Sequence, residues 1–137
     1  MKAIIMAGGG GTRLFPLSRK SMPKQFLAID GDNSLLEETI IRCKSFARDD
    51  DILIVTNELY EQHVRTELEH VGVKVANVVL EPVSRNTAPA IALAAKFAQE
   101  KLGAGSDEVL VVSTSDHIIR PAETFRAAVG LAVKAAE

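Results

Sequence analysis

A glycine-rich run near the amino terminus could hold a phosphate group. The residues Gly8-Gly9-Gly10-Gly11-Thr12-Arg13 directly follow a short apolar stretch at 3–6. Glycine lets the backbone come close to a ligand, and successive backbone amides can surround phosphate oxygens. Arg13 and, further along, Lys24 supply cations, and an arginine can meet a phosphate with two parallel hydrogen bonds. We therefore predict that Ala7 through Thr12 bind a nucleotide, with Arg13 and Lys24 at its phosphates.

Two widespread phosphate-binding motifs do not match this run. The P-loop places a lysine and then a serine or threonine after its last glycine, whereas Thr12-Arg13 stands here. The dinucleotide-binding fingerprint requires a third glycine at the position of Leu14. The sequence therefore indicates a nucleotide-binding loop of another kind. Arg19 and Lys20 are also basic and lie close by, but they are weaker candidates.

A second polar cluster lies between Glu81 and Thr87. A carboxylate at Glu81 can accept hydrogen bonds from N1–H and from the 2-amino group of guanine, which lie side by side. Asn86 and the free amides at the start of the next helix can hold the base or the ribose. A proline turn before a helix capped by Thr87 explains Pro82, but it does not explain Glu81, Arg85 and Asn86 together. We therefore expect Glu81, Asn86 and Thr87 to belong to the nucleotide site.

A third cluster, Ser115-Asp116-His117, follows another apolar run. An aspartate at the end of a strand is a suitable oxygen ligand for Mg²⁺, which binds nucleotides through one or two carboxylates and phosphate oxygens. We therefore predict Asp116 as a metal ligand. His117 could act as a base, although histidine is not a preferred ligand of Mg²⁺. His63 and His70 are expected on the surface of a helix.

The elements that must position these clusters alternate between strand and helix. Strands are expected at 3–6, 52–56, 73–80 and 109–112, and helices at 35–47, 58–71, 87–101 and 121–136. Ser34, Asn57 and Thr87 are the expected helix caps. This order predicts a Rossmann-like α/β fold with a mostly parallel sheet and helices on both faces. Because each polar cluster follows a strand, all three are expected in one crevice at the carboxyl ends of the strands.

Composition restricts the class of protein further. The chain has 137 residues, 47% of them hydrophobic, which suits a single globular domain, and its net charge of −2 disfavours binding to a nucleic-acid backbone. No apolar stretch approaches the ~20 residues of a membrane span. The single cysteine, Cys43, is expected in the core, and the lack of a second one fits a reducing compartment, so we expect a cytoplasmic protein. Assembly into a homo-oligomer stays open.

The three clusters together resemble the signatures of sugar-nucleotide pyrophosphorylases. Residues 8–19 followed by Pro23-Lys24-Gln25-Phe26 are similar to the first signature of that family. Leu17-Ser18-Arg19, Glu81-Pro82 with residues 85–92, and Ser115-Asp116-His117 resemble the mannose-1-phosphate guanylyltransferase branch. The resemblance implies a nucleotidyltransferase-type fold that transfers GMP from GTP to mannose 1-phosphate, with Mg²⁺, giving GDP-mannose and pyrophosphate. It also implies that the glycine loop and Arg13 hold the triphosphate, that Lys24 meets phosphate, and that Asp116 binds the metal.

Two departures from the family pattern matter. Thr114 stands where the family commonly has a proline, two residues before Asp116. Family enzymes also continue well beyond this length and use the later part for the sugar site and a second metal-binding aspartate. Residues 1–137 are therefore expected to be the nucleotide-binding part of a truncated domain that lacks the sugar-binding part and is inactive by itself.

Two alternative functions stay open. The first is a glucose-1-phosphate nucleotidyltransferase that uses dTTP or UTP, which Glu81 disfavours because a pyrimidine does not offer guanine's pair of donors. The second, for the chain as it stands, is a nucleotide-binding module without catalysis.

Overall fold

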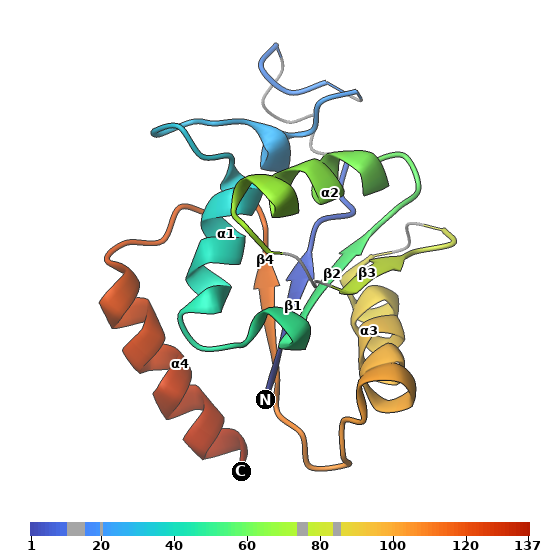
Figure 1. Cartoon of the computed structure of the whole chain (residues 1–137), viewed down its shortest axis with the longest axis vertical. Coiled ribbons are helices and arrows are strands. Elements are labelled where there is room, and N and C mark those ends of the chain that lie inside the picture. The colour runs from blue at the N-terminus through green and yellow to red at the C-terminus, as the bar shows by residue number, and fades with distance from the viewer. Residues whose placement is uncertain (11–15, 20, 74–76, 84–85) are drawn as a thin grey trace.

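The computed structural model describes residues 1–10, 16–19, 21–73, 77–83 and 86–137. Within these residues one sheet of four parallel strands has the order β3-β2-β1-β4. The strands are β1 (Lys2–Met6), β2 (Ile52–Thr56), β3 (Asn77–Leu80) and β4 (Leu110–Thr114). All four point toward the same end of the molecule (Figure 1). Their carboxyl ends therefore form one edge of the sheet, which we call the carboxyl edge, and their amino ends form the opposite, amino edge.

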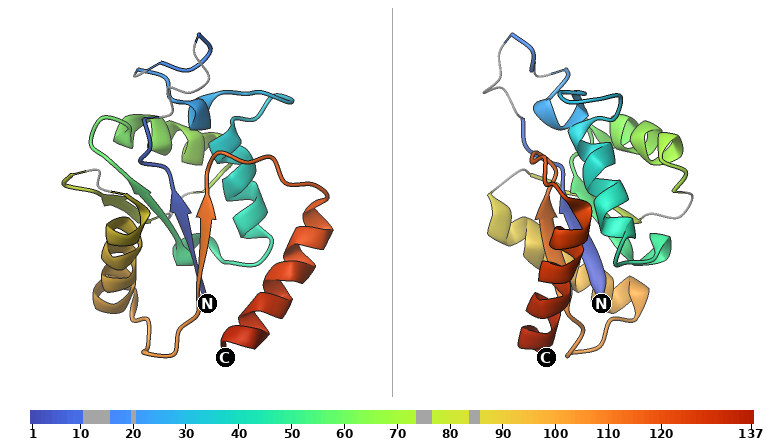
Figure 2. Two further views of the ribbon diagram at one scale, coloured as in Figure 1. Left: turned by 180° about the vertical axis from the view of Figure 1, so that it is seen from behind. Right: turned by 90° about the vertical axis from the view of Figure 1, so that its left-hand side faces the viewer.

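Helices cover both faces of this sheet, as the sequence predicts (Figure 2). The side chains of β1 and β2 alternate between the two faces: Ile5 and Ile54 contact α1 and α2, and Ile4 and Leu53 contact α3. Strands buried on both faces read as continuous apolar runs, which explains the residues at 52–56. The helices are α1 (Leu35–Lys44), α2 (Glu61–His70), α3 (Thr87–Leu102) and α4 (Ala122–Ala136), with short 3₁₀ helices at Lys24–Phe26 and Asp49–Asp51.

Several local expectations are confirmed. Ser34 forms a capping box with Glu37 at the start of α1, and Cys43 is fully buried in the core. Gly103 ends α3 in the left-handed conformation, which glycine adopts at little cost. The strand expected at 109–112 continues to Thr114. Of the strand expected at 73–80, Asn77–Leu80 is confirmed, and residues 74–76 lie outside the described part of the chain.

Two predicted helix caps are wrong. The helix expected from residue 58 begins at Glu61 after Tyr60, and the Asn57 side chain instead donates to the carbonyl of Gly8 at 3.2 Å. Thr87 is the first residue of α3, and Asn86 occupies the cap position without a side-chain capping bond. Asn57 and Asn86 therefore lie at the carboxyl edge, and neither side chain caps a helix.

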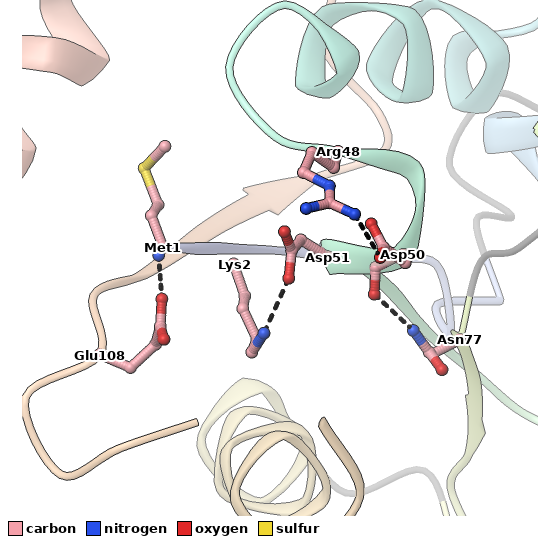
Figure 3. Close-up of polar contacts among 7 residues, drawn as sticks. All are labelled: Met1, Lys2, Arg48, Asp50, Asp51, Asn77 and Glu108. Atoms are coloured by element: carbon pink, nitrogen blue, oxygen red, sulfur yellow. Dashed lines mark hydrogen bonds and ion pairs between the residues drawn. The ribbon is translucent and has the colours of Figure 1, made fainter. Parts of the chain in front are cut away.

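Polar contacts hold the amino edge together (Figure 3). The Nζ atom of Lys2 lies 2.8 Å from a carboxylate oxygen of Asp51, and the amide of Asn77 donates to the carbonyl of Asp50 at 3.0 Å. The amino terminus pairs with Glu108. These contacts join the starts of β1, β2, β3 and β4, so they fix the strands at the edge opposite the glycine-rich run.

Helix α4 lies outside the β4 end of the sheet (Figure 1). Its Phe125 ring stands 6.2 Å from the ring of Phe46, and the Arg42 guanidinium lies 5.3 Å from the centre of the Phe125 ring. Val129 is the single buried residue of α4, all of which is described. Neither this helix nor any other in the described ranges combines the length and the apolar character needed to cross a bilayer.

Candidate nucleotide site

The turn that follows β1 lies at the centre of the carboxyl edge. Ala7 is buried, and its amide donates to the carbonyl of Val55 at 2.8 Å, which extends the pairing of β1 with β2 by one residue. Gly8 is half-buried, and Gly9 and Gly10 are exposed. The chain therefore passes from the fully buried core to solvent within four residues, Ala7 to Gly10.

Three side chains from two other parts of the chain bind the carbonyls of this turn. The buried amide of Gln25 donates to Ala7 at 3.1 Å and to Gly9 at 3.0 Å. Thr56 donates its hydroxyl to the carbonyl of Ala7 at 3.2 Å, and Asn57 donates to Gly8 as described above. The carbonyls of residues 7–9 are thus occupied by protein donors. No hydrogen bond links the Gly8, Gly9 or Gly10 amides to another described residue, which leaves these donors for a ligand.

Lys24 and Asp116 form an ion pair beside the turn. The Nζ atom of Lys24 lies 2.5 Å from Oδ2 of Asp116, and both side chains are about three-quarters buried, with exposures of 26% and 28%. Lys24 opens the 3₁₀ helix that also carries Gln25. The amide and the hydroxyl of Ser115 both bond to the carbonyl of Met6, so the residues after β4 are held against the end of β1.

The Asp116 carboxylate keeps its charge in this setting. Its burial favours the neutral acid, but hydrogen bonds from Lys24 and Thr114 and the charges of Lys24 and His117 outweigh burial and lower its pKa. Its second oxygen, Oδ1, has no hydrogen-bond donor among the described residues, but it lies 2.7 Å from Nδ1 of His117 and pairs with that nitrogen when the imidazole is protonated. A charged carboxylate in such a setting fits a Mg²⁺ site that is completed by phosphate oxygens. The described residues contain no group of three or more carboxylate, histidine or cysteine ligands, so they do not form a metal cage by themselves.

Glu81 stands on the other side of the glycine turn. Its backbone amide donates to the carbonyl of Thr56 at 2.7 Å, which places the residue directly after β3. The side chain is buried against Gly8, and burial raises the pKa of the carboxyl group. The carboxylate has no hydrogen-bond partner among the described residues.

Asn86 and Thr87 lie at the start of α3 and are both exposed. Asn86 has a φ of 54°, in the left-handed region that asparagine tolerates better than most residues. Its side chain makes no capping bond, and the first amides of α3 have no partner among the described residues, as an anion or ribose site at a helix start requires.

Contacts join the three predicted clusters into one continuous set. Asp116 pairs with Lys24, the next residue Gln25 binds the turn at Ala7 and Gly9, and Gly8 contacts Glu81. Gly11, Thr12 and Arg13, which are predicted at the phosphates, lie outside the described residues, as do Lys20 and Arg85. The structure therefore brings Glu81, Lys24 and Asp116 together with Gly8 at the carboxyl edge, and their common use as one nucleotide site stays a prediction.

Sequence reasoning misses the residues that hold the turn in place. The sequence indicates Gln25 only as part of a signature, and it predicts Asn57 as a helix cap. The signal that identifies the other clusters applies here too, because Thr56 and Asn57 are polar residues at the end of a buried strand. The histidines divide: His70 is exposed and pairs with Glu37, but His63 is half-buried, with its ring 5.1 Å from the Phe26 ring.

An open hollow at the amino edge is a poor alternative site. It lies between residues 106–110 and the end of α4. Its charged residues are acidic, namely Asp107, Glu108 and the terminal Glu137, so it would repel a triphosphate. The carboxyl edge is therefore the better location for an anionic ligand.

A parallel α/β sheet with a glycine turn, a lysine and an aspartate at its carboxyl edge defines a nucleotide-binding class of protein. The chain matches the family described as Nucleotidyl transferase over residues 2–137, and it belongs to that family.

Similar proteins identify the branch of the family more closely. The Xanthan biosynthesis protein XanB of Xanthomonas campestris pv. campestris is 47% identical over 98% of this chain. The mannose-1-phosphate guanylyltransferase of Escherichia coli K12 is 42% identical over 98% of the chain. The resemblance to the mannose-1-phosphate guanylyltransferase branch is thereby confirmed. The chain spans 28% of the length of each of these two relatives.

A solved structure agrees with the fold. The crystal structure described as mannose-1-phosphate geranyltransferase from Thermus thermophilus superposes with a TM-score of 0.83 and 32% sequence identity. The match covers 99% of this chain and 38% of that one. The predicted α/β fold of nucleotidyltransferase type is therefore confirmed.

Proposed function

We propose that residues 1–137 are the GTP-binding part of a mannose-1-phosphate guanylyltransferase, which transfers GMP from GTP to mannose 1-phosphate and releases pyrophosphate. The observation that carries this proposal is the meeting of Glu81, the glycine turn and the Lys24–Asp116 pair at one edge of the sheet. Each offers what a different part of the nucleotide needs. We also propose that the reaction takes place in the cytoplasm, where GTP is available.

The turn binds phosphate through its backbone amides. Because Gln25, Thr56 and Asn57 hold the carbonyls of residues 7–9, the turn keeps one orientation when an anion approaches. A turn already fixed in this way loses little conformational entropy on binding. Lys24 and Arg13 supply the positive charge that the amides lack.

Glu81 accounts for the choice of base. Its carboxylate accepts from N1–H and the 2-amino group of guanine, and it replaces the water that those donors lose on binding. A pyrimidine base offers no such pair, so the observed lack of any partner for this buried carboxylate among the described residues favours GTP over dTTP and UTP.

The chemistry is an in-line displacement at phosphorus. A phosphate oxygen of mannose 1-phosphate attacks the α-phosphorus of GTP, and the bond from that phosphorus to the pyrophosphate oxygen breaks. The attacking oxygen is already ionised at neutral pH, so the protein contributes position and charge and needs no base. Lys24 neutralises charge on the α-phosphate or on the incoming phosphate. Asp116 would hold Mg²⁺, which when bound neutralises phosphate charge.

The test is nucleotide binding to this chain with Mg²⁺, measured by isothermal titration calorimetry. We expect GTP to bind at least about tenfold more tightly than dTTP or UTP, because the buried carboxylate rejects bases without the donor pair. Mixing the chain with GTP and mannose 1-phosphate should release no pyrophosphate, since these residues span only 28% of the length of the relatives. Equal affinity for the three nucleotides would contradict the assignment of Glu81, and absence of GTP binding would contradict the proposed function itself.

Replacing Asp116 tests the metal assignment. We expect Asp116→Ala to weaken Mg²⁺-dependent GTP binding by at least about tenfold. Loss of a residue that only hydrogen-bonds to a metal ligand already has an effect of this size, and loss of the ligand itself costs at least as much. Circular dichroism should show an unchanged fold. The matched control is Asp107→Ala, which removes an exposed aspartate at the amino edge. The same Mg²⁺ dependence in both variants would exclude Asp116 as the ligand.

A further inference from the structure

The contact between Gly8 and Glu81 requires a glycine for a reason other than phosphate binding. A side chain beginning at Gly8 would collide with Oε2 of Glu81, closer than real Cβ atoms approach another atom. The same Cβ would lie 3.6 Å from Cδ of Glu81 and 3.8 Å from the Cα atom of Thr56, which are ordinary contact distances. A Cβ added at Gly9 or Gly10 would meet no described atom within 4 Å.

The collision would be relieved by the carboxylate and not by the turn. The backbone around Gly8 is fixed by the bonds from Ala7 to Val55 and from Asn57 to Gly8. Within the described part of the chain, Glu81 is held by its backbone amide, and the end of its side chain makes no hydrogen bond there. Gly8 also has no positive φ, so an alanine can adopt its backbone conformation. An added methyl group would therefore leave the fold intact and displace the carboxylate.

We infer that Gly8 is a specificity-determining residue: because residue 8 has no side chain, the Glu81 carboxylate has the space in which it hydrogen-bonds to the base. The inference rests on the proposed function, in which Glu81 recognises guanine. It assigns to one glycine of the turn a task that Gly9 and Gly10 do not share. Base selection and phosphate binding are then coupled, because the turn that meets the phosphates also sets the position of the base-reading group.

A second consequence separates Gly8 from Glu81 by experiment. If residue 8 acts only through Glu81, then a methyl group at residue 8 has no effect once the Glu81 side chain is removed. Two changes that act through one contact are non-additive, whereas independent changes add. A double-mutant cycle therefore distinguishes this inference from a general loss of function in the turn.

The experiment compares GTP with inosine triphosphate, which lacks the 2-amino group, by titration calorimetry of the 137-residue chain. The variants are Gly8→Ala, Glu81→Ala, the double variant, and Gly105→Ala as the matched control, since Gly105 lies at the amino edge and a Cβ added there meets no described atom within 4 Å. We expect wild type and Gly105→Ala to prefer GTP at least about tenfold, as a hydrogen bond to a charged group provides. Gly8→Ala and Glu81→Ala should both bind the two nucleotides with nearly equal affinity, and the double variant should match Glu81→Ala.

The outcomes separate the two proposals. If Glu81→Ala keeps the preference for GTP, the proposed recognition of guanine by Glu81 is wrong. If Glu81→Ala loses the preference but Gly8→Ala keeps it, only the inference about Gly8 is overturned. A further loss of GTP affinity in the double variant relative to Glu81→Ala would also overturn it.

Thermal denaturation shows whether a variant loses binding because it has lost its fold. We expect Gly8→Ala to melt within a few degrees of wild type, since only the end of a flexible side chain must move. Should it melt much lower, a collision with Glu81 predicts that the double variant recovers the melting temperature. Failure to recover would show that the turn itself excludes a side chain, and the inference would be wrong.

Discussion

At the scale of single residues, two carboxylates of the site occupy opposite electrostatic settings. Asp116 is paired with Lys24, whose hydrogen bond and charge help to lower its pKa despite burial. Glu81 is buried without a cation or a hydrogen bond from another described residue, and burial raises its pKa. One carboxylate is thus stabilised in its charged form by the protein, and the other is left to be stabilised by a ligand.

Because it is buried, the ionised Glu81 side chain lowers the free energy of unfolding near neutral pH. A pKa raised in the folded state means that the folded chain binds the proton more readily, so the free energy of unfolding falls as pH rises from the ordinary pKa of glutamate through the raised one. We expect Glu81→Gln to raise the melting temperature at pH 7 by on the order of a few degrees. The difference should vanish below the ordinary pKa of glutamate, at about pH 4.

Melting curves recorded from about pH 4 to about pH 8 measure this difference. The control is Glu100→Gln, which changes an exposed glutamate of α3 and should give a smaller shift at pH 7. A stabilisation by Glu81→Gln that is the same at both ends of this range would mean that ionisation is not its cause.

At the scale of elements, local signals predict what depends on local chemistry. The apolar runs of β1 and β2 and the Ser34 cap are properties of adjacent residues, and the structure has them as expected. The prediction for Asn57 is wrong because its partner, the carbonyl of Gly8, lies 49 positions away and belongs to another element. The position of Lys24 beside Asp116 likewise depends on how the parallel strands align. Composition and spacing predict only that both residues lie at the same edge of the sheet.

Ser34 provides a test of one predicted element. Its side chain accepts from the amide of Glu37 at 3.0 Å, and it also donates to Glu67 of α2, so it joins two helices. We expect Ser34→Ala to lower the free energy of unfolding by about 1–2 kcal/mol, as loss of a capping residue does. Urea denaturation measures this change, with Thr66→Ala in α2 as a control that removes only an exposed back-bond within its own helix. Equal values for the two variants would show that the cap contributes nothing.

At the scale of the whole molecule, stability is unequally distributed. The core on one face of the sheet joins β1 and β2 to α1 and α2, and the core on the other face joins them to α3. Helix α4 contributes one buried residue, Val129, and an aromatic contact through Phe125. Helices with little buried surface open locally without unfolding the rest.

Hydrogen exchange followed by mass spectrometry should detect this inequality. We expect amides of α4 to exchange at least about tenfold faster than those of α1, because opening α4 exposes little apolar surface. Phe125→Ala should speed exchange in α4 further and leave α3 unchanged, so α3 serves as the control within the same experiment. Equal protection of α4 and α1 would contradict this distribution.

The parallel register also makes the two edges of the sheet unequal for protein engineering. The connection through residues 103–109, which leads into β4, lies at the amino edge, a full strand of roughly 16 Å from the glycine turn. A fluorophore or affinity tag grafted at Gly105 would therefore lie far from the proposed nucleotide site. The same graft at Asn57 or Pro82 would lie beside that proposed site.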